Sequence, residues 1–202
     1  MINWLKSLFT KSNDSDFKDQ IKSNILISQR IIALIAIISK VHQGNSDGLV
    51  SWVNDDNISN FFSEDEKKFF NETEPNQESL EFFSWKAEAT VSLLWALNKI
   101  DIFPNLHEQY DIFELPIIKE IIDSPNNFIQ TSVLRNEKEI REKELDLIHQ
   151  HHRVRFNSGN LFESDNDIPR EQLNYNIVYE RRYGLSWIVD VNEKWDSVST
   201  DT

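Results

Sequence analysis

The sequence has no cysteine and little glycine or proline. Its 202 residues include 4 Gly and 5 Pro. The lack of cysteine excludes a thiolate nucleophile, an iron–sulfur cluster and a zinc ribbon, and it is consistent with a reducing compartment. A chain of this length can bury roughly 70% of its unfolded surface in one core, so it needs neither a disulfide nor a metal to fold. We therefore expect a single domain located in the cytoplasm.

Basic residues are also scarce relative to acidic ones. There are 21 Lys and Arg against 34 Asp and Glu, which gives a formal net charge of −13. A chain this acidic repels nucleic acid and anionic lipid at long range and attracts basic proteins. We therefore expect a basic protein as the partner, no nucleic acid and no stable membrane association.

The N-terminal segment, residues 1–16, has no basic region followed by a long apolar stretch, so no signal peptide is predicted. Four of its apolar residues share one helical face: Trp4, Leu5, Leu8 and Phe9. This pattern predicts either a short amphipathic helix or a frayed end. The most apolar run, Ile25 to Ile38, is interrupted at residues 28–30 and falls short of the roughly 18 apolar residues that span a bilayer. It predicts a buried core helix.

Helical spacing recurs along the rest of the chain. Apolar residues three, four or seven positions apart predict helices over four ranges: Phe17 to Gly44, Leu80 to Ile100, Asn126 to Phe156 and Arg170 to Val189. Ser63 and Glu66 form a capping box at the start of a shorter helix. No pair of segments has the alternation of a strand hairpin. The sequence predicts an all-α fold, a single helical domain of about seven helices over residues 17–202.

The C-terminal segment is unusually aromatic for a chain end. It carries Tyr179, Tyr183, Trp187 and Trp195, with acids and bases between them. Chain ends are usually polar and poorly ordered. We therefore predict a tail docked into the body, with Trp187 and Trp195 largely buried.

Several charged residues interrupt apolar helical faces. An unpaired charge in the interior loses several kcal/mol of solvation. We therefore expect Glu88 and Glu180 to pair with arginines. The candidate partners are Arg30, Arg181 and Arg182, and Arg181 is the first choice for Glu88. The predicted structural polar network consists of Arg30, Glu88, Glu180, Arg181 and Asp196.

The alternative interpretation of these acids is catalytic. Glu88 or Glu180, with a pKa raised by burial, could act with His152 as acid/base groups of a hydrolase or another small-molecule enzyme. His152 also belongs to a cluster with His149 and His151, but the three do not converge on one helical face. We therefore predict no metal site and no cofactor.

Aromatic residues next to acids indicate a binding surface. Adjacent phenylalanines on a helix cannot both face one core, and exposed apolar patches mark partner surfaces. The predicted binding residues are Trp52, Asp55, Asp56, Phe61, Phe62, Glu64 and Asp65.

Three segments together resemble a bacterial family known as a domain of unknown function, DUF4272. They are Val178-Tyr179-Glu180-Arg181 through Trp187 to Trp195-Asp196, Trp85-Lys86-Ala87-Glu88-Ala89 with Leu93 to Leu97, and Asp146-Leu147-Ile148 followed by His152. The chain departs from the pattern at Gln150 and Arg153. The resemblance spans most of the chain and implies a helical, cytoplasmic bacterial protein, without supplying an activity.

Two classes of function remain. The first, which we favour, is a non-enzymatic protein-binding module, comparable by analogy to antitoxin or immunity proteins. The second is the enzyme that would use Glu88, Glu180 and His152. A pocket in which these three side chains converge would favour the enzyme.

Overall fold

The computed structural model describes residues 20–155 and 168–200, and within these two ranges every regular element is a helix. The predicted all-α fold is therefore confirmed. The predicted N-terminal segment, residues 1–16, lies outside the described residues, as does Phe17, the expected start of the first core helix.

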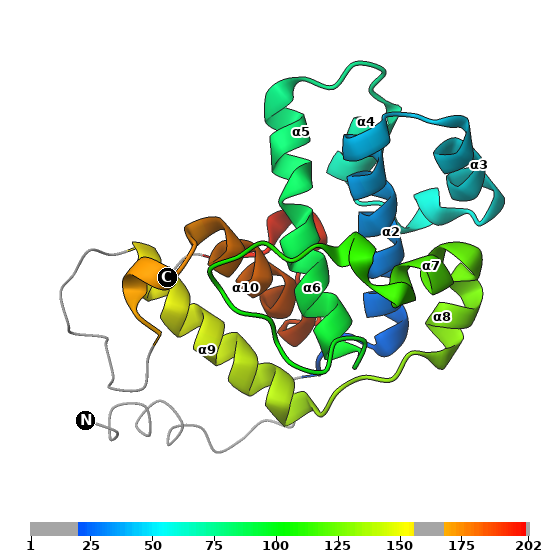
Figure 1. The fold of residues 1–202 in the computed structure, drawn as a ribbon. Helices are drawn as coiled ribbons and strands as arrows, with labels where there is room; N and C mark the ends of the chain where they lie inside the picture. The colour runs from blue at the N-terminus through cyan, green and yellow to red at the C-terminus, as the bar shows by residue number, and fades with distance from the viewer. Residues whose placement is uncertain (1–19, 156–167, 201–202) are drawn as a thin grey trace.

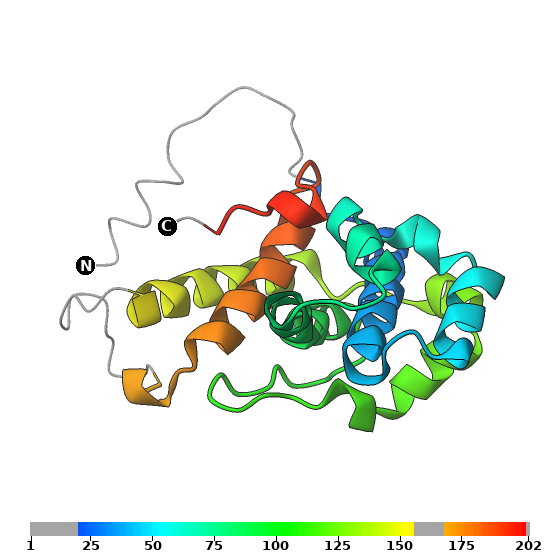
Figure 2. The ribbon, with the colours of Figure 1, turned by 90° about the horizontal axis from the view of Figure 1, so that it is seen from above.

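Four helices form a series across the molecule. α2 (Asn24–Gln43) packs against α6 (Lys86–Ala96), α6 against α10 (Tyr175–Val189), and α10 against α9 (Glu137–Arg155). Figure 1 shows α6 between α2 and α10, and Figure 2 shows α9 at the outer side of α10. The core therefore runs from α2 through α6 to α10.

The remaining helices are shorter. The α-helices are α3 (Asp47–Asp55), α4 (Glu64–Asn71), α5 (Gln77–Ser84), α7 (Pro116–Asp123) and α8 (Pro125–Thr131), and the 3-10 helices are η1 (Ile58–Phe61), η2 (Ile112–Glu114), η4 (Arg170–Gln172) and η5 (Trp195–Ser197). α3, α4, α5, α7 and α8 all contact α2. In Figure 1, α3, α7 and α8 lie on the side of α2 away from α10, and α5 stands above α6.

α2 is the central core helix. Ser23 caps its N-terminus by accepting a hydrogen bond from the Leu26 amide, and Gly44 ends it with φ of 63°, a conformation that favours glycine. Among the described residues it is the one helix long and apolar enough to cross a membrane, with a mean hydropathy of 1.7, but 72% of that stretch is buried inside the protein. The helix extends beyond the predicted run from Ile25 to Ile38, and the predicted burial is confirmed for most of that run.

Two long helices predicted from periodicity are each broken. The range from Leu80 to Ile100 divides at Trp85 into α5 and α6, where the Glu88 amide donates to the Trp85 carbonyl in a tighter turn. The range from Asn126 to Phe156 divides into α8 and α9, and Val133, which lies between them, is 66% exposed. Periodicity does not detect these breaks because the apolar spacing continues across them.

Arg135 accounts for the second break. Its amide donates to the Ala96 carbonyl at 2.7 Å, and its guanidinium donates to the carbonyls of Trp95 and Ile100, both at 3.1 Å. Arg135 thus satisfies carbonyls at the C-terminus of α6, which a helical segment at this position could not reach. The last helix also starts later than predicted, at Tyr175 with Asn174 as its N-cap, after the short η4.

Candidate functional site

α6 and α10 approach each other closely at Gly184. A Cβ atom on Gly184 would lie 2.8 Å from the Ala89 carbonyl oxygen and 3.2 Å from the Cβ of Ser92. The Ser92 hydroxyl donates to the Arg181 carbonyl at 2.8 Å. This contact brings the charged residues at the start of α6 against those in the middle of α10.

Glu88 and Arg181 form a buried ion pair across this interface. The Arg181 Nε donates to one carboxylate oxygen of Glu88 at 2.8 Å, and Nη2 lies 2.7 Å from the same oxygen. Arg181 is 0% exposed and Glu88 1% exposed. The pairing predicted for Arg181 from the sequence is therefore observed.

The same pair holds a long loop against the helices. Arg181 Nη1 donates to the carbonyls of Pro104 at 2.8 Å and Asn105 at 2.5 Å. The second oxygen of Glu88 accepts from the Tyr110 amide at 2.9 Å. The two side chains thus position residues 104–110 as well as joining two helices.

A second buried pair lies beside the first. Lys86 Nζ donates to both oxygens of Glu180, at 2.9 and 3.0 Å, and lies 4.5 and 4.4 Å from the ring centroids of Phe82 and Tyr183. Burial raises the pKa of Glu180, although Lys86 opposes the shift. The sequence predicted an arginine partner for Glu180, and that prediction was wrong: Lys86, the first residue of α6, reaches it instead.

The other members of the predicted network lie elsewhere. Arg30 pairs with Glu66 of α4 at 2.5 Å and also donates to the Phe61 carbonyl. Asp196 is exposed and accepts from the Asp65 amide at 3.3 Å, in the first turn of α4. The five residues therefore do not form one network, because Arg30 and Asp196 serve α4 rather than the α6–α10 interface.

The tail is docked as predicted. Trp187 is 7% exposed and Trp195 6% exposed, and their rings meet edge to face with centroids 5.4 Å apart. The Tyr183 hydroxyl donates to the Trp195 carbonyl. Lys22 donates to three carbonyls after α10, those of Asp190, Val191 and Glu193.

His151, rather than His152, is the buried histidine of α9. Its Nδ1 lies 2.5 Å from Arg182 Nη1, and its ring contacts those of Tyr175 and Tyr179, each with centroids 5.6 Å away. Burial, reinforced by the Arg182 charge, lowers the pKa of His151 to about 4. His151 is therefore neutral near pH 7. Burial lowers the pKa of the half-buried His152 as well.

We name residues 100–115 the acidic loop. This segment contains four acids and no Lys or Arg. All four acids are exposed: Asp101, Glu108, Asp111 and Glu114. The loop crosses in front of α6 and α10 (Figure 1).

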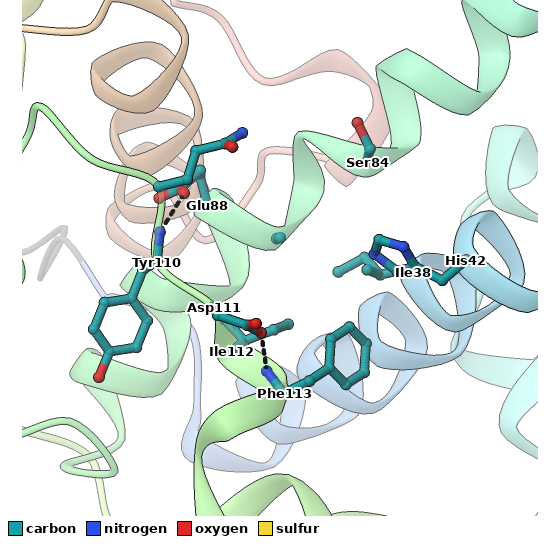
Figure 3. Close-up of a pocket in the computed structure, with 10 residues that line it drawn as sticks. Ile38, His42, Ser84, Glu88, Tyr110, Asp111, Ile112 and Phe113 are labelled. Carbon is teal, nitrogen blue, oxygen red and sulfur yellow. Dashed lines mark hydrogen bonds between the residues drawn. The ribbon is translucent and has the colours of Figure 1, made fainter.

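A pocket of about 550 Å³ opens between the acidic loop and the helices. α2 contributes Ile38 and His42, α6 contributes Ala87 and Glu88, Ser84 ends α5, and the acidic loop contributes residues 109–113. Figure 3 shows Phe113 and His42 on one side of it and Tyr110 on the other. The rings of His42 and Phe113 meet edge to face with centroids 5.8 Å apart.

The predicted acid/base residues do not converge in this pocket. Of Glu88, Glu180 and His152, only Glu88 lines it, and the hydrogen bonds to Arg181 and Tyr110 occupy both of its carboxylate oxygens. Glu180 is held by Lys86. Within the described ranges there is also no group of three or more His, Asp and Glu residues placed to hold a metal ion.

The predicted binding surface on α3, η1 and α4 is only partly available. Phe62 is 6% exposed and belongs to the core, and Phe61 and Trp52 are half-buried against it. Phe62 is therefore removed from the predicted surface. Asp55, Glu64 and Asp65 are exposed, and Asp56 is half-buried. Glu64 pairs with Lys67 and Asp65 with Lys68, each at 2.8 Å.

The residues that line the pocket from the acidic loop were missed by the sequence analysis. Tyr110, Asp111 and Phe113 belong to no long periodic segment. The run from Ile100 to Leu115, acidic and without Lys or Arg, is the signal that could have identified them.

A comparison with protein-family models matches residues 12–198 of the chain to the family described as a domain of unknown function (DUF4272). Neither curated proteins nor solved structures gave a match to the chain. The matched range includes the buried pairs, the acidic loop and the docked tail. Because the match covers most of the sequence, the chain belongs to the DUF4272 family.

Proposed function

We propose that this protein is a non-enzymatic module that binds a basic partner protein. The proposal is supported by the way in which the fold distributes its charges between interior and surface. Acidic proteins attract cationic partners and accelerate their association through long-range steering.

The observation that carries the proposal is the inward orientation of basic side chains. Ten Lys, Arg and Glu side chains are buried among the described residues: Lys22, Arg30, Lys40, Lys86, Arg153, Arg181, Arg182, Glu66, Glu88 and Glu180. These seven bases and three acids carry a net charge of +4. Since the whole chain carries −13, the remainder carries −17. Folding therefore leaves the rest of the chain more acidic than the composition suggests.

Two of the buried bases hydrogen-bond to carbonyls at the ends of helices. Lys40 Nζ donates to the carbonyls of Phe70 at 2.8 Å and Glu72 at 2.5 Å, at the end of α4. Lys22 does the same at the end of α10. Cations near helix C-termini satisfy carbonyls and complement the helix dipole. Side chains held in this way are not available on the surface to pair with the exposed acids.

The geometry of the acids favours binding over acid/base catalysis. A general acid or base needs a carboxyl group within hydrogen-bond reach of its substrate. Glu88 and Glu180 instead each pair with a buried base. No specific observation supports the enzyme alternative.

The proposal is tested by affinity capture from native lysate, with the full chain as bait. The matched control is an eight-acid variant in which Asp55, Asp56, Glu64, Asp65 and the four acids of the acidic loop become Asn or Gln. Its formal charge falls from −13 to −5. We expect the wild type to retain a basic protein at 0.1 M salt and to release it at 1 M, as the Debye length falls from about 10 Å to about 3 Å. The variant should retain much less of it.

The proposal is contradicted if the retained partner is acidic, or if its binding is unchanged by salt and by loss of the eight acids. Circular dichroism and thermal melting of the variant establish that the loss is not due to unfolding. Surface charges seldom contribute more than about 1 kcal/mol to folding.

A further inference from the structure

We propose that the pocket beneath the acidic loop is the docking site for a cationic segment of the basic partner, with a Lys or Arg side chain entering between Phe113 and α6. This inference rests on the proposed function and specifies the surface that performs it. The occupant is an extended peptide segment of a protein, in which aliphatic stems end in positive charges.

The charge around the pocket fits such a segment. The Asp111 carboxylate lines it, Glu88 lines it already paired with the buried Arg181, and none of the described residues that line it is Lys or Arg. Asp101, Glu108 and Glu114 lie exposed on the same loop. His107 Nε2 lies 3.9 Å from the Glu108 carboxylate. A cation that approaches the pocket therefore meets predominantly negative charge.

The wall of the pocket fits the aliphatic stem of a basic side chain. Ile38, Ala87 and Ile112 supply apolar surface for methylene groups. Phe113 is 40% exposed at the rim, opposite the Tyr110 side of the pocket (Figure 3). An ammonium or guanidinium group within about 6 Å of an aromatic ring is attracted to its face. A volume of about 550 Å³ accommodates more than one side chain and lies within the usual range of binding pockets.

Hydrogen bonds hold the rim of the pocket in place. Glu88 accepts from the Tyr110 amide at 2.9 Å, and the Asp111 carboxylate accepts from the Phe113 amide at 2.9 Å. Arg181 fixes the loop from behind through the carbonyls of Pro104 and Asn105. A surface ordered before binding loses less conformational entropy when a partner docks.

The surface on α3 and α4 is less suited to the same partner. Glu64 and Asp65 already pair with Lys67 and Lys68 on the same helix, and Phe62 is buried. A cation arriving there must compete with these lysines. This contrast allows the two acidic surfaces to be tested against each other.

The test uses acetyl-hexalysine amide as the probe and the full chain at 0.1 M salt. A nitrogen–proton correlation spectrum is recorded during the titration, and affinity is measured by fluorescence anisotropy of the labelled peptide. Two variants each lose four acids: a loop set (D101N, E108Q, D111N and E114Q) and a helix set (D55N, D56N, E64Q and D65N). A third variant, Ala87→Phe, fills the pocket without changing charge. Circular dichroism and melting temperature establish that each variant is folded.

We expect saturable shifts centred on the amides of Ala87, Glu88 and residues 109–113. The loop set and Ala87→Phe should each weaken binding about tenfold or more, and the helix set should weaken it only a few-fold. Equal weakening by the loop and helix sets, or shifts centred on α3 and α4, would overturn the pocket and leave the proposed function standing. If Ala87→Phe does not fold, the location of the shifts and the comparison of the loop set with the helix set still show whether the peptide binds in the pocket. Absence of any saturable binding of hexalysine would overturn the proposed function itself.

Discussion

The α6–α10 interface and the acidic loop both carry acidic side chains, but in opposite environments. At the interface, Glu88 and Glu180 are buried and each is paired with a base. On the loop, Asp111 and its acidic neighbours are exposed, and no Lys or Arg lies in that stretch of sequence. The interface uses charge to fix how helices meet, whereas the loop presents charge to solvent.

The two regions are nevertheless connected. Glu88 and Arg181 join the helices and also hydrogen-bond to the loop through Tyr110 and Asn105. We infer from this comparison that the buried Glu88–Arg181 pair determines the position of the exposed acids on the loop. The following changes are designed to break or sharpen this contrast, in order of decreasing effect.

Breaking a buried pair should have the largest effect on stability. Lys86→Met removes the partner of Glu180 and leaves a buried carboxylate, which should lower the free energy of unfolding by about 3–5 kcal/mol at pH 7. The matched control is Lys119→Met, which removes an exposed pair with Asp123 on α7. It should cost less than about 1 kcal/mol. Urea denaturation measures both, and similar losses for the two variants would contradict the account.

Lowering the pH should destabilise the packing of α9 against α10 through His151. Its pKa is lowered in the folded protein to about 4, so the folded state binds a proton later than the unfolded state does. The stability that the neutral His151 contributes is fully present above about pH 6.5 and is lost as the pH falls toward 4. By pH 5 the loss is about 2 kcal/mol.

The contribution of His151 is isolated by comparing wild type with His151→Gln. Burial raises the pKa values of Glu144 and Glu180, so protonation of these groups acts in the opposite direction in both proteins. The free energy of unfolding should fall more steeply between pH 7 and pH 5 in the wild type. Parallel pH profiles would show that His151 does not contribute in this way.

Widening the α6–α10 contact should have a smaller effect. Gly184→Ala places a methyl group 2.8 Å from the Ala89 carbonyl oxygen, so the helices must separate. Overpacking should outweigh the gain in helix propensity and give a net loss of about 1–2 kcal/mol. The matched control is Gly48→Ala on α3, where nothing lies within 4 Å of the new methyl group. That change should be neutral or slightly stabilising, and equal melting temperatures for the two variants would refute the close contact.

Much of the fold could be predicted because helical periodicity and capping are local. The capping box of Ser63 and Glu66 is observed with both hydrogen bonds, and the all-α class follows from spacing alone. The helix breaks at Trp85 and near Ser132 could not be predicted in the same way. They depend on contacts such as that of Arg135 with the end of α6, which the linear pattern does not contain.

The candidate site was predictable in its chemistry more than in its geometry. A buried Glu88 needs a cation, and Arg181 was the foreseeable choice. The pairing of Glu180 with Lys86 depends on the register between α6 and α10, which Gly184 permits and no local signal specifies. The pocket required the loop to fold back onto α6, and that position is fixed by hydrogen bonds between residues distant in sequence.

The central claim, that the buried pair positions the acidic loop, is tested most directly by hydrogen exchange at the Tyr110 amide. This amide lies outside regular structure, yet it donates to Glu88. Arg181→Lys keeps the charge but removes the guanidinium fork that reaches Pro104 and Asn105. We expect exchange at Tyr110 to accelerate far more than exchange at the core amides of α2. Unchanged exchange at Tyr110, or equal acceleration in the loop and in α2, would contradict the claim.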